Sequence, residues 1–278
     1  MSRTQVLVIV SIVLLMGVLL SLDIHKAGKP AGDNKPNRMP SAQVQAVPVL
    51  NLDSMQSKDL SVLSPEQAKV LNQEKEEAKK NPGFETYTRL GDTWNKSSKS
   101  VWAGHYYFKA AELKPGLENW LKAGDALNES LSNNQDTSSA RLIFTESTKA
   151  FSEAIKLDST NLDAKTGLGV AYVAGGDNPM QGIGLLLGVV SKDPNNIKAN
   201  FSLGLFSMKS GQYQKAINRF KTVVSQKPGA EAYFYLAQAY QNLNLKKEAI
   251  DAYLQSKKYI DDAQTLTSID HLIKELTN

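Results

Sequence analysis

The side chains that most often carry out catalysis are few in this chain and lie far apart. It has no cysteine, which excludes thiolate nucleophiles, thiolate metal sites and disulfides. Its three histidines, His25, His105 and His271, fall on three separate predicted segments. General acid–base and metal chemistry need such groups within hydrogen-bond or coordination distance of one another. We therefore expect no enzymatic activity, no cofactor and no metal, and a packing or surface role for His105.

Glycines are dense between residues 167 and 188, and a phosphate-binding loop is one reason for such a cluster. That loop needs a strand before it and a Gly-Lys-Ser/Thr sequence after it, and neither is present. Glycine inside a helix costs up to about 1 kcal/mol relative to alanine. The glycines therefore predict either a weakly stable segment or two helices that pack unusually close together.

The charge of the chain is nearly balanced. Its formal net charge is +4 over 278 residues, with the charged residues spread along predicted helices. A balance this close to neutral favours neither nucleic acid nor an acidic substrate as a partner.

The chain opens with a hydrophobic segment, Val6 to Leu22, that contains no charged residue. As a helix it would span about 26 Å, slightly less than the roughly 30 Å hydrocarbon core of a bilayer. The sequence predicts that residues 1–22 form a single transmembrane signal-anchor. A cleaved signal peptide is the alternative, because Arg3 gives a basic N-terminal region, but no small-x-small cleavage site follows the segment.

Two features of the flanks favour opposite sides of the membrane for the rest of the chain. Lys26, Lys29, Lys35 and Arg38 follow the span, and counting these charges favours the cytoplasm. A short basic N-terminus before the first apolar segment is instead the usual export signal. We expect a single-pass protein of the bacterial inner membrane whose folded part is extracytoplasmic, in the periplasm.

Proline and glycine recur from residue 23 to 63 without helical or strand periodicity, so this segment is predicted to be a flexible linker. A helix is predicted next. Ser64 can cap it, Pro65 suits its first position, and Gln67 completes a capping box. We interpret residues 64–82 as an N-terminal capping helix, with a detached charged helix as the alternative.

The stretch from Ala230 to Asp261 has the pattern of two short helices folded back on each other, and the same template fits four more times upstream. Small residues recur in the two helices of each unit, large residues follow them at helical spacing, and proline often ends the unit. The small residues are Gly91, Gly124, Gly169, Gly204 and Ala237 in the first helices, and Ala103, Gly182, Ala216 and Ala249 in the second. The large residues are Trp94, Tyr107, Phe151, Tyr172, Phe220, Tyr240 and Tyr253, and the prolines are Pro115, Pro194 and Pro228.

This pattern resembles the tetratricopeptide repeat (TPR), a helix–turn–helix unit of about 34 residues. The resemblance implies an all-α TPR superhelix, or solenoid, because one unit cannot bury its apolar face alone. The five predicted units are 84–116, 117–161, 162–196, 197–229 and 230–263, and a C-terminal capping helix, 264–278, follows them.

The second unit departs from the pattern, because it is about eleven residues longer than the repeat. The extra residues include a polar run from 132 to 139. We predict a loop that projects from one edge and lengthens the helix that follows it, at little cost in closure entropy.

The resemblance also implies a mode of action, since ligands of this family usually lie in the concave groove lined by the first helices. The groove positions of units one and two are Thr88, Asp92, Asn95, Leu121, Asp125 and Asn128, which are polar and mildly acidic. Those of units three to five are Thr166, Val170, Val173, Phe201, Leu205, Met208, Phe234, Gln238 and Gln241, which are largely apolar. The Lys, Asn and Arg clamp of the family's chaperone-binding members is absent, which disfavours that class of partner.

The predicted peptide-binding residues are therefore Val170, Val173, Phe201, Leu205, Met208, Phe234 and Gln238. Phe201, Leu205 and Phe234 would anchor an apolar or amphipathic segment of a protein or peptide ligand. The alternative is that some of these side chains pack against neighbouring units, Val173 and Met208 above all. We expect a membrane-anchored, non-enzymatic scaffold or adaptor; a periplasmic holdase-like helper for exported chains and a structural homo-oligomer are the alternatives.

Overall fold

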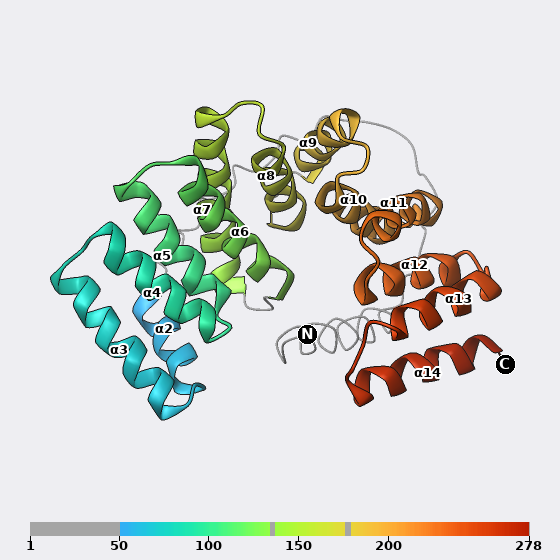
Figure 1. Cartoon of the computed structure of the whole chain (residues 1–278), viewed down its shortest axis with the longest axis horizontal. Helices are drawn as coiled ribbons and strands as arrows, with labels where there is room; N and C mark the ends of the chain where they lie inside the picture. The colour runs from blue at the N-terminus through green and yellow to red at the C-terminus, as the bar shows by residue number, and fades with distance from the viewer. Residues whose placement is uncertain (1–50, 134–136, 176–178, 278) are drawn as a thin grey trace, which may run out of the picture.

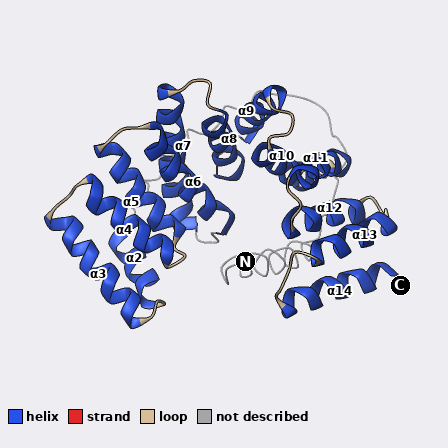
Figure 2. Cartoon of the chain, viewed as in Figure 1, coloured by secondary structure: helices blue, strands red, loops and turns tan. Residues whose placement is uncertain are grey.

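The computed structural model describes residues 51–133, 137–175 and 179–277, and all regular secondary structure in these residues is helical (Figure 2). The helices are α2 (Leu52–Ser61), α3 (Pro65–Lys80), α4 (Phe84–Lys96), α5 (Ser100–Leu113), α6 (Leu117–Asn133), α7 (Thr137–Leu157), α8 (Leu162–Gly175), α9 (Pro179–Lys192), α10 (Ile197–Lys209), α11 (Tyr213–Gln226), α12 (Ala230–Asn242), α13 (Lys246–Lys257) and α14 (Ala263–Thr277). The segment predicted as a membrane anchor lies outside the described residues. Within the described ranges, no helix is both long and apolar enough to cross a bilayer.

Consecutive helices form pairs, and each pair packs on the next, so the predicted helical solenoid is present. The pairs are α4 with α5, α6 with α7, α8 with α9, α10 with α11 and α12 with α13. They follow an arc that begins at α2 and α3 and ends at α14 (Figure 1). The first helices of neighbouring pairs also touch, α6 on α8, α8 on α10 and α10 on α12. We call the face formed by α4, α6, α8, α10 and α12 the first-helix surface.

Large side chains from the second helices join successive units. Phe151 of α7 is fully buried, and its ring lies against Gly124 of α6 and Gly167 of α8, where a Cβ atom on either glycine would overlap the ring. One aromatic ring therefore holds the first helices of two units together. A fully buried phenylalanine removes enough apolar surface from water to contribute about 1.5–3 kcal/mol.

The glycine-rich third unit combines close packing with bare surface. A Cβ atom on Gly182 of α9 would lie 2.5 Å from the carbonyl oxygen of Gly169 on α8. The two helices therefore cross closely at this point, as one of the two alternatives predicted. Gly184 and Gly188 differ, because a Cβ atom on either would have no neighbour within 4 Å. Among the described residues, no neighbour therefore requires glycine at these two positions.

The linker predicted for residues 23–63 is wrong at its C-terminal end, where α2 forms. Asn51 caps this helix, and its Oδ1 accepts a hydrogen bond from the Ser54 N–H at 3.0 Å. Leu52 and Met55 pack against the core formed by α3 to α8. The apolar residues of α2 are too few to give a clear periodic signal, and its stability comes from docking on α5.

The capping helix predicted from Ser64 is present as α3. The Ser64 side chain accepts from the Gln67 N–H and the Gln67 side chain accepts from the Ser64 N–H, which completes the predicted capping box. Leu71 and Ala78 are buried against α4, so α3 is docked rather than detached. At the other end of the chain, α14 packs on α13 with Ile269 almost fully buried, as expected of a terminal cap.

The long second unit contains two extended helices rather than a long projecting loop. α6 continues to Asn133 and α7 begins at Thr137, with 17 and 21 residues respectively. Only residues 134–136 of the predicted loop lie outside the description. Helix propagation adds one backbone hydrogen bond for each residue, so the polar residues of this run extend the two helices.

The two kinds of glycine in α9 give a matched pair of stability predictions. We expect Gly182→Ala to destabilise the fold by about 1–3 kcal/mol, because the methyl group must displace backbone. Gly188→Ala should stabilise it by up to about 1 kcal/mol, because the new methyl group only improves helix propensity. Urea unfolding of both variants, followed by circular dichroism, measures the difference. Equal effects of the two substitutions would show that α8 and α9 are not in close contact.

A second prediction concerns the docking of α2. The Asp59 carboxylate accepts hydrogen bonds from the Lys99 ammonium and, at 2.7 Å, from the Trp102 indole N–H. Asp59→Ala leaves the N–H of the buried Trp102 unpaired, which costs about 1–3 kcal/mol. We expect faster amide hydrogen exchange throughout α2, whereas Asp59→Asn retains an acceptor and should lie close to the wild type. Unchanged exchange in the alanine variant would mean that this contact does not hold α2 in place.

Candidate functional site

The first-helix surface carries ion pairs that join different units. Asp92 of α4 contacts the Lys122 ammonium of α6 at 2.9 Å and accepts a hydrogen bond from the Tyr107 hydroxyl at 2.7 Å. Partial burial opposes ionisation of Asp92, but the hydrogen bonds from Lys122 and Tyr107 outweigh it and lower the pKa of this carboxyl. The Lys122 ammonium also lies 4.0 Å from the centre of the Tyr107 ring.

A second pair continues along the same surface. Asp125 of α6 lies 3.5 Å from the Lys198 ammonium of α10. About half of the side-chain surface remains exposed in each member of both pairs, from 46% for Asp92 to 61% for Lys198. Exposed pairs of this kind contribute about 0–1 kcal/mol to stability. The surface therefore presents charges of both signs, where the sequence suggested a mild acidic excess.

Two predicted polar groove residues serve the fold instead. The Asn128 amide donates to the Gly167 carbonyl oxygen at 2.8 Å, which links α6 to α8. Thr166 is 1% exposed, and its hydroxyl donates to the Leu162 carbonyl oxygen one turn earlier. Thr166 is therefore not presented to a ligand as predicted, and the amide of the half-buried Asn128 is engaged by the backbone of α8.

Two of the seven predicted peptide-binding residues are buried, which corrects that part of the prediction. Phe234, predicted as an anchor, is 5% exposed, and its ring packs against Tyr235 and Tyr253. Met208 is 9% exposed and belongs to the same core. Both side chains fill the core of the last two units, which leaves little of their surface for a ligand.

The remaining predicted residues are half-buried. Phe201 packs edge-on against Phe220 and Tyr235, with ring centres 5.7 and 5.8 Å apart. Val173 packs against α9 at Gly182. The full half-buried set is Val170, Val173, Phe201, Leu205 and Gln238. It offers a shallow apolar strip rather than deep anchor pockets.

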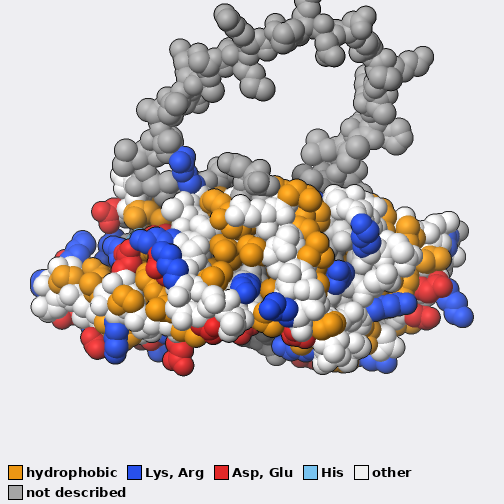
Figure 3. Space-filling view, turned by 90° about the horizontal axis from the view of Figure 1, so that it is seen from above, with side chains coloured by type: hydrophobic (Ala, Val, Ile, Leu, Met, Phe, Trp, Pro, Cys, Tyr) orange, Lys and Arg blue, Asp and Glu red, His pale blue; other side chains and the backbone are white. Residues whose placement is uncertain are grey.

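More exposed apolar side chains lie elsewhere. Two of them are on α9, where Met180 is 66% exposed and Leu187 is 45% exposed. Seen from above the arc, hydrophobic side chains gather in the middle of the molecule, and charged side chains crowd its left end, where α2 to α5 lie (Figure 3). Periodicity placed the apolar binding residues on the first helices, but part of the exposed apolar surface lies on a second helix.

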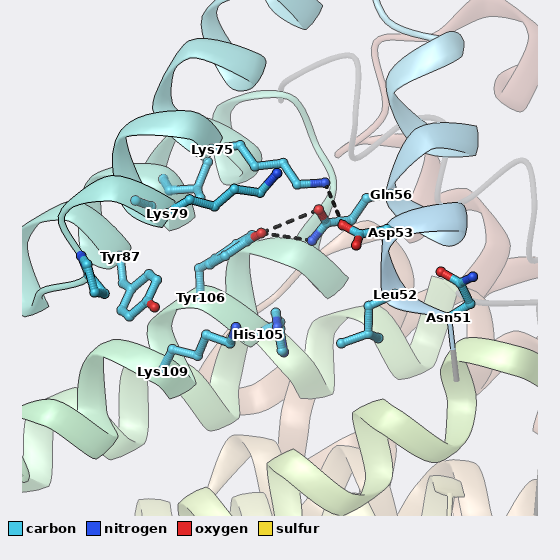
Figure 4. A pocket seen from close by; sticks show the side chains of 13 residues that line it. Asn51, Leu52, Asp53, Gln56, Lys75, Lys79, Tyr87, His105, Tyr106 and Lys109 are labelled. Carbon is cyan, nitrogen blue, oxygen red and sulfur yellow. Dashed lines mark hydrogen bonds and ion pairs between the residues drawn. The ribbon is translucent and has the colours of Figure 1, made fainter. Parts of the chain in front are cut away.

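A pocket that the sequence did not predict lies between α2, α3, α4 and α5 (Figure 4). We call it the N-terminal pocket; its volume is about 780 Å³. It is lined by Asn51, Leu52, Asp53, Gln56, Lys75, Ala78, Lys79, Pro82, Tyr87, Leu90, His105, Tyr106 and Lys109. Three lysines against one carboxylate give the lining a positive charge. No sequence pattern indicated this pocket, because α2 was assigned to a linker.

Hydrogen bonds fix several of the pocket's side chains. The Lys75 ammonium contacts Asp53 at 3.0 Å, and the Gln56 amide donates to the Tyr106 hydroxyl oxygen at 2.9 Å (Figure 4). Burial raises the pKa of Tyr106, so its hydroxyl stays protonated at neutral pH. The Lys109 ammonium lies 5.6 and 5.8 Å from the ring centres of Tyr87 and Tyr106.

His105 has the packing role expected for it, with an acidic partner from the next unit. It is 5% exposed, and its Nδ1 lies 2.8 Å from the Glu146 carboxylate of α7. In the described part of the chain, no three histidine or acidic residues are grouped so as to hold a metal ion.

Comparisons with known proteins agree with this architecture. Residues 201–263 match the family model described as tetratricopeptide repeat. No curated protein matches the sequence. Among solved structures, a thermophilic TPR protein of Thermus thermophilus is similar at 15% identity and a TM-score of 0.52, over 70% of this chain and 99% of that one.

Two further structures are similar. The APC/C hetero-tetramer Cut9–Hcn1 matches at 19% identity and a TM-score of 0.53, over 73% of this chain and 39% of that one. The MamA protein matches at 22% identity and a TM-score of 0.45, over 63% of this chain and 90% of that one. At these identities, the two matches with scores above 0.5 show the fold alone. The chain therefore has the fold of tetratricopeptide repeat solenoids, and residues 201–263 carry the sequence pattern of that family.

Proposed function

We propose that this chain is a membrane-anchored scaffold or adaptor that holds a protein or peptide partner along its first-helix surface. The observation that carries the proposal is the row of half-exposed ion pairs, Asp92 with Lys122 and Asp125 with Lys198, which runs across α4, α6 and α10. Since such pairs add little to stability, their charges are available to a partner at small cost to the fold.

The geometry of a solenoid suits this role. Each unit packs mainly on its neighbours, so side chains on successive first helices are presented at regular intervals over an extended face. A partner that lies along this face can make several weak contacts at once. Half-exposed charges of both signs lie on α4, α6 and α10, and the half-buried apolar side chains Phe201 and Leu205 also lie on α10.

The best match is a partner segment that carries both kinds of side chain. Its charged or polar residues would contact the ion pairs, and its apolar residues would cover the strip. Because Phe201 is only half-buried and already packs on Phe220, the apolar contacts would be shallow. A helix or extended segment laid on the surface fits better than a side chain inserted into a deep pocket.

The proposed anchor is the uncharged segment Val6 to Leu22, which has the length and composition of a single span. It would hold the solenoid beside a bacterial inner membrane, with the repeat units on the periplasmic side. The tether between the span and α2 gives the solenoid reach away from the bilayer.

The absence of cysteine permits a direct test of topology. We expect Ser225→Cys, on the exposed face of α11, to react with a membrane-impermeant maleimide in cells whose outer membrane has been permeabilised. Ser2→Cys, on the other side of the span, should react only after lysis. The reverse pattern would place the units in the cytoplasm, and reaction of both residues before lysis would contradict a spanning segment.

A matched pair of double variants tests the binding surface. Asn95→Lys with Asp125→Lys changes two exposed positions of the first helices, and Asn218→Lys with Asp251→Lys makes the same changes on second helices α11 and α13. Exposed substitutions usually alter stability by less than about 0.5 kcal/mol, so both proteins should fold. Proximity labelling from the C-terminus of the full chain should lose specific neighbours only in the first variant.

Unchanged neighbours in the first double variant would contradict binding on the first-helix surface. If neighbours are lost, the range of chains that this protein binds separates an adaptor from a holdase-like helper. Displacement by one defined peptide supports the adaptor, and equal binding of many unrelated unfolded chains contradicts it. Recovery of a second copy of this chain alone would indicate a structural oligomer instead.

A further inference from the structure

We infer that the N-terminal pocket binds a small organic anion, one carboxylate or phosphate group carried on an apolar body. This site is separate from the first-helix surface, because α2 and α3 build much of its wall and precede the repeat units. The volume of about 780 Å³ lies within the range of small-molecule sites, which is roughly 300–1,000 Å³.

Incomplete neutralisation of Lys109 indicates that the ligand is an anion. Lys109 is half-buried on α5, and no carboxylate among the described residues forms an ion pair with it. Its ammonium faces the rings of Tyr87 and Tyr106 at 5.6 and 5.8 Å, close to the limit of about 6 Å for an effective cation–π interaction. The rings compensate this charge only in part, so an anion beside it would be stabilised.

The other two lysines of the pocket have partners that an anion can replace or join. The Lys75 side chain is 15% exposed and is bound to Asp53, whose side chain is 82% exposed. Lys79 pairs with Glu76 one turn earlier, with both side chains 59% exposed, and an exposed pair of this kind is worth about 0–1 kcal/mol. All three lysines extend from α3 and α5 toward the space beside α2 (Figure 4), so one anionic group can interact with their combined charge.

The rest of the lining indicates an apolar body on the anion. Leu52 and Pro82 contribute accessible apolar surface, and the rings of Tyr87 and Tyr106 are stacked with their centres 6.2 Å apart. An inorganic anion would leave this surface in contact with water. Burying apolar area adds about 25 cal/mol for each Å², so an anion with a hydrocarbon or aromatic part should bind more tightly.

Isothermal titration of the full chain with phenyl phosphate tests the site. Inorganic phosphate and phenol serve as probes that each lack one of the two features. We expect phenyl phosphate to bind at least about tenfold more tightly than either, with an affinity that falls as salt is raised. Dihexanoyl phosphatidic acid tests whether the natural ligand is a lipid headgroup or a soluble anion. Tighter binding than that of phenyl phosphate assigns the site to a lipid headgroup, and weaker binding assigns it to a soluble anion.

Two lysine variants locate the site. Lys109→Met removes the charge and keeps the hydrocarbon stem, and should weaken phenyl phosphate binding about tenfold. Lys149→Met is the matched control, since this ammonium lies 5.0 Å from the Phe108 ring outside the pocket, and its binding should equal the wild type. Lys79→Met, at an exposed position, supplies a second pocket variant should Lys109→Met fail to fold.

Absence of phenyl phosphate binding would overturn the inference. So would equal binding by the Lys109→Met and Lys149→Met proteins, or equal affinity for phenyl phosphate and inorganic phosphate. These outcomes leave the proposed partner surface untouched, because Asn95 and Asp125 do not line the pocket. Loss of labelled neighbours in the Asn95→Lys with Asp125→Lys protein would likewise say nothing about the anion site.

Discussion

The structure depends on the close contact between a large side chain of one helix and a bare stretch of backbone on another. Phe151 shows this contact most clearly, because its ring lies on Gly124 in its own unit and on Gly167 in the next. Its burial is possible only when both first helices are in place, so the second unit is stabilised by the third. Stability in such a stack comes from interfaces between neighbours rather than from single units.

The same constraint decides which residues remain for binding. An apolar residue on a first helix can face the solvent or the following unit, and helical spacing alone does not separate these directions. Met208 belongs to the core shared with the following unit, and Phe234 packs on Tyr253 inside its own unit. What remains on the first helices is a row of half-exposed charges and a shallow apolar strip, which favours extended, multipoint contact over a deep anchor.

The N-terminal end is built by a different principle. α2 is short and has few apolar residues, so it cannot be stable as an isolated helix. It is held by Leu52 and Met55 on the core, by Gln56 on Tyr106, and by Asp59 on Trp102. Docking of a short helix across three others leaves a pocket between them and gathers lysines from α3 and α5 along its wall. The end cap of the solenoid thereby acquires a candidate site that the repeats do not have.

Local sequence patterns were enough to predict the helical class, the pairing of helices from α4 to α13 and the caps at Ser64 and α14. These features follow from local spacing, proline and glycine positions and capping residues, which act over a few neighbouring residues. The helical state of α2, the extension of α6 and α7 and the burial of Phe234 became evident only in three dimensions. These outcomes depend on contacts between distant segments: Gln56 meets Tyr106 across 50 residues, and Lys198 meets Asp125 across 73. Such contacts produce no periodic pattern in the sequence, because each is an isolated contact between two side chains.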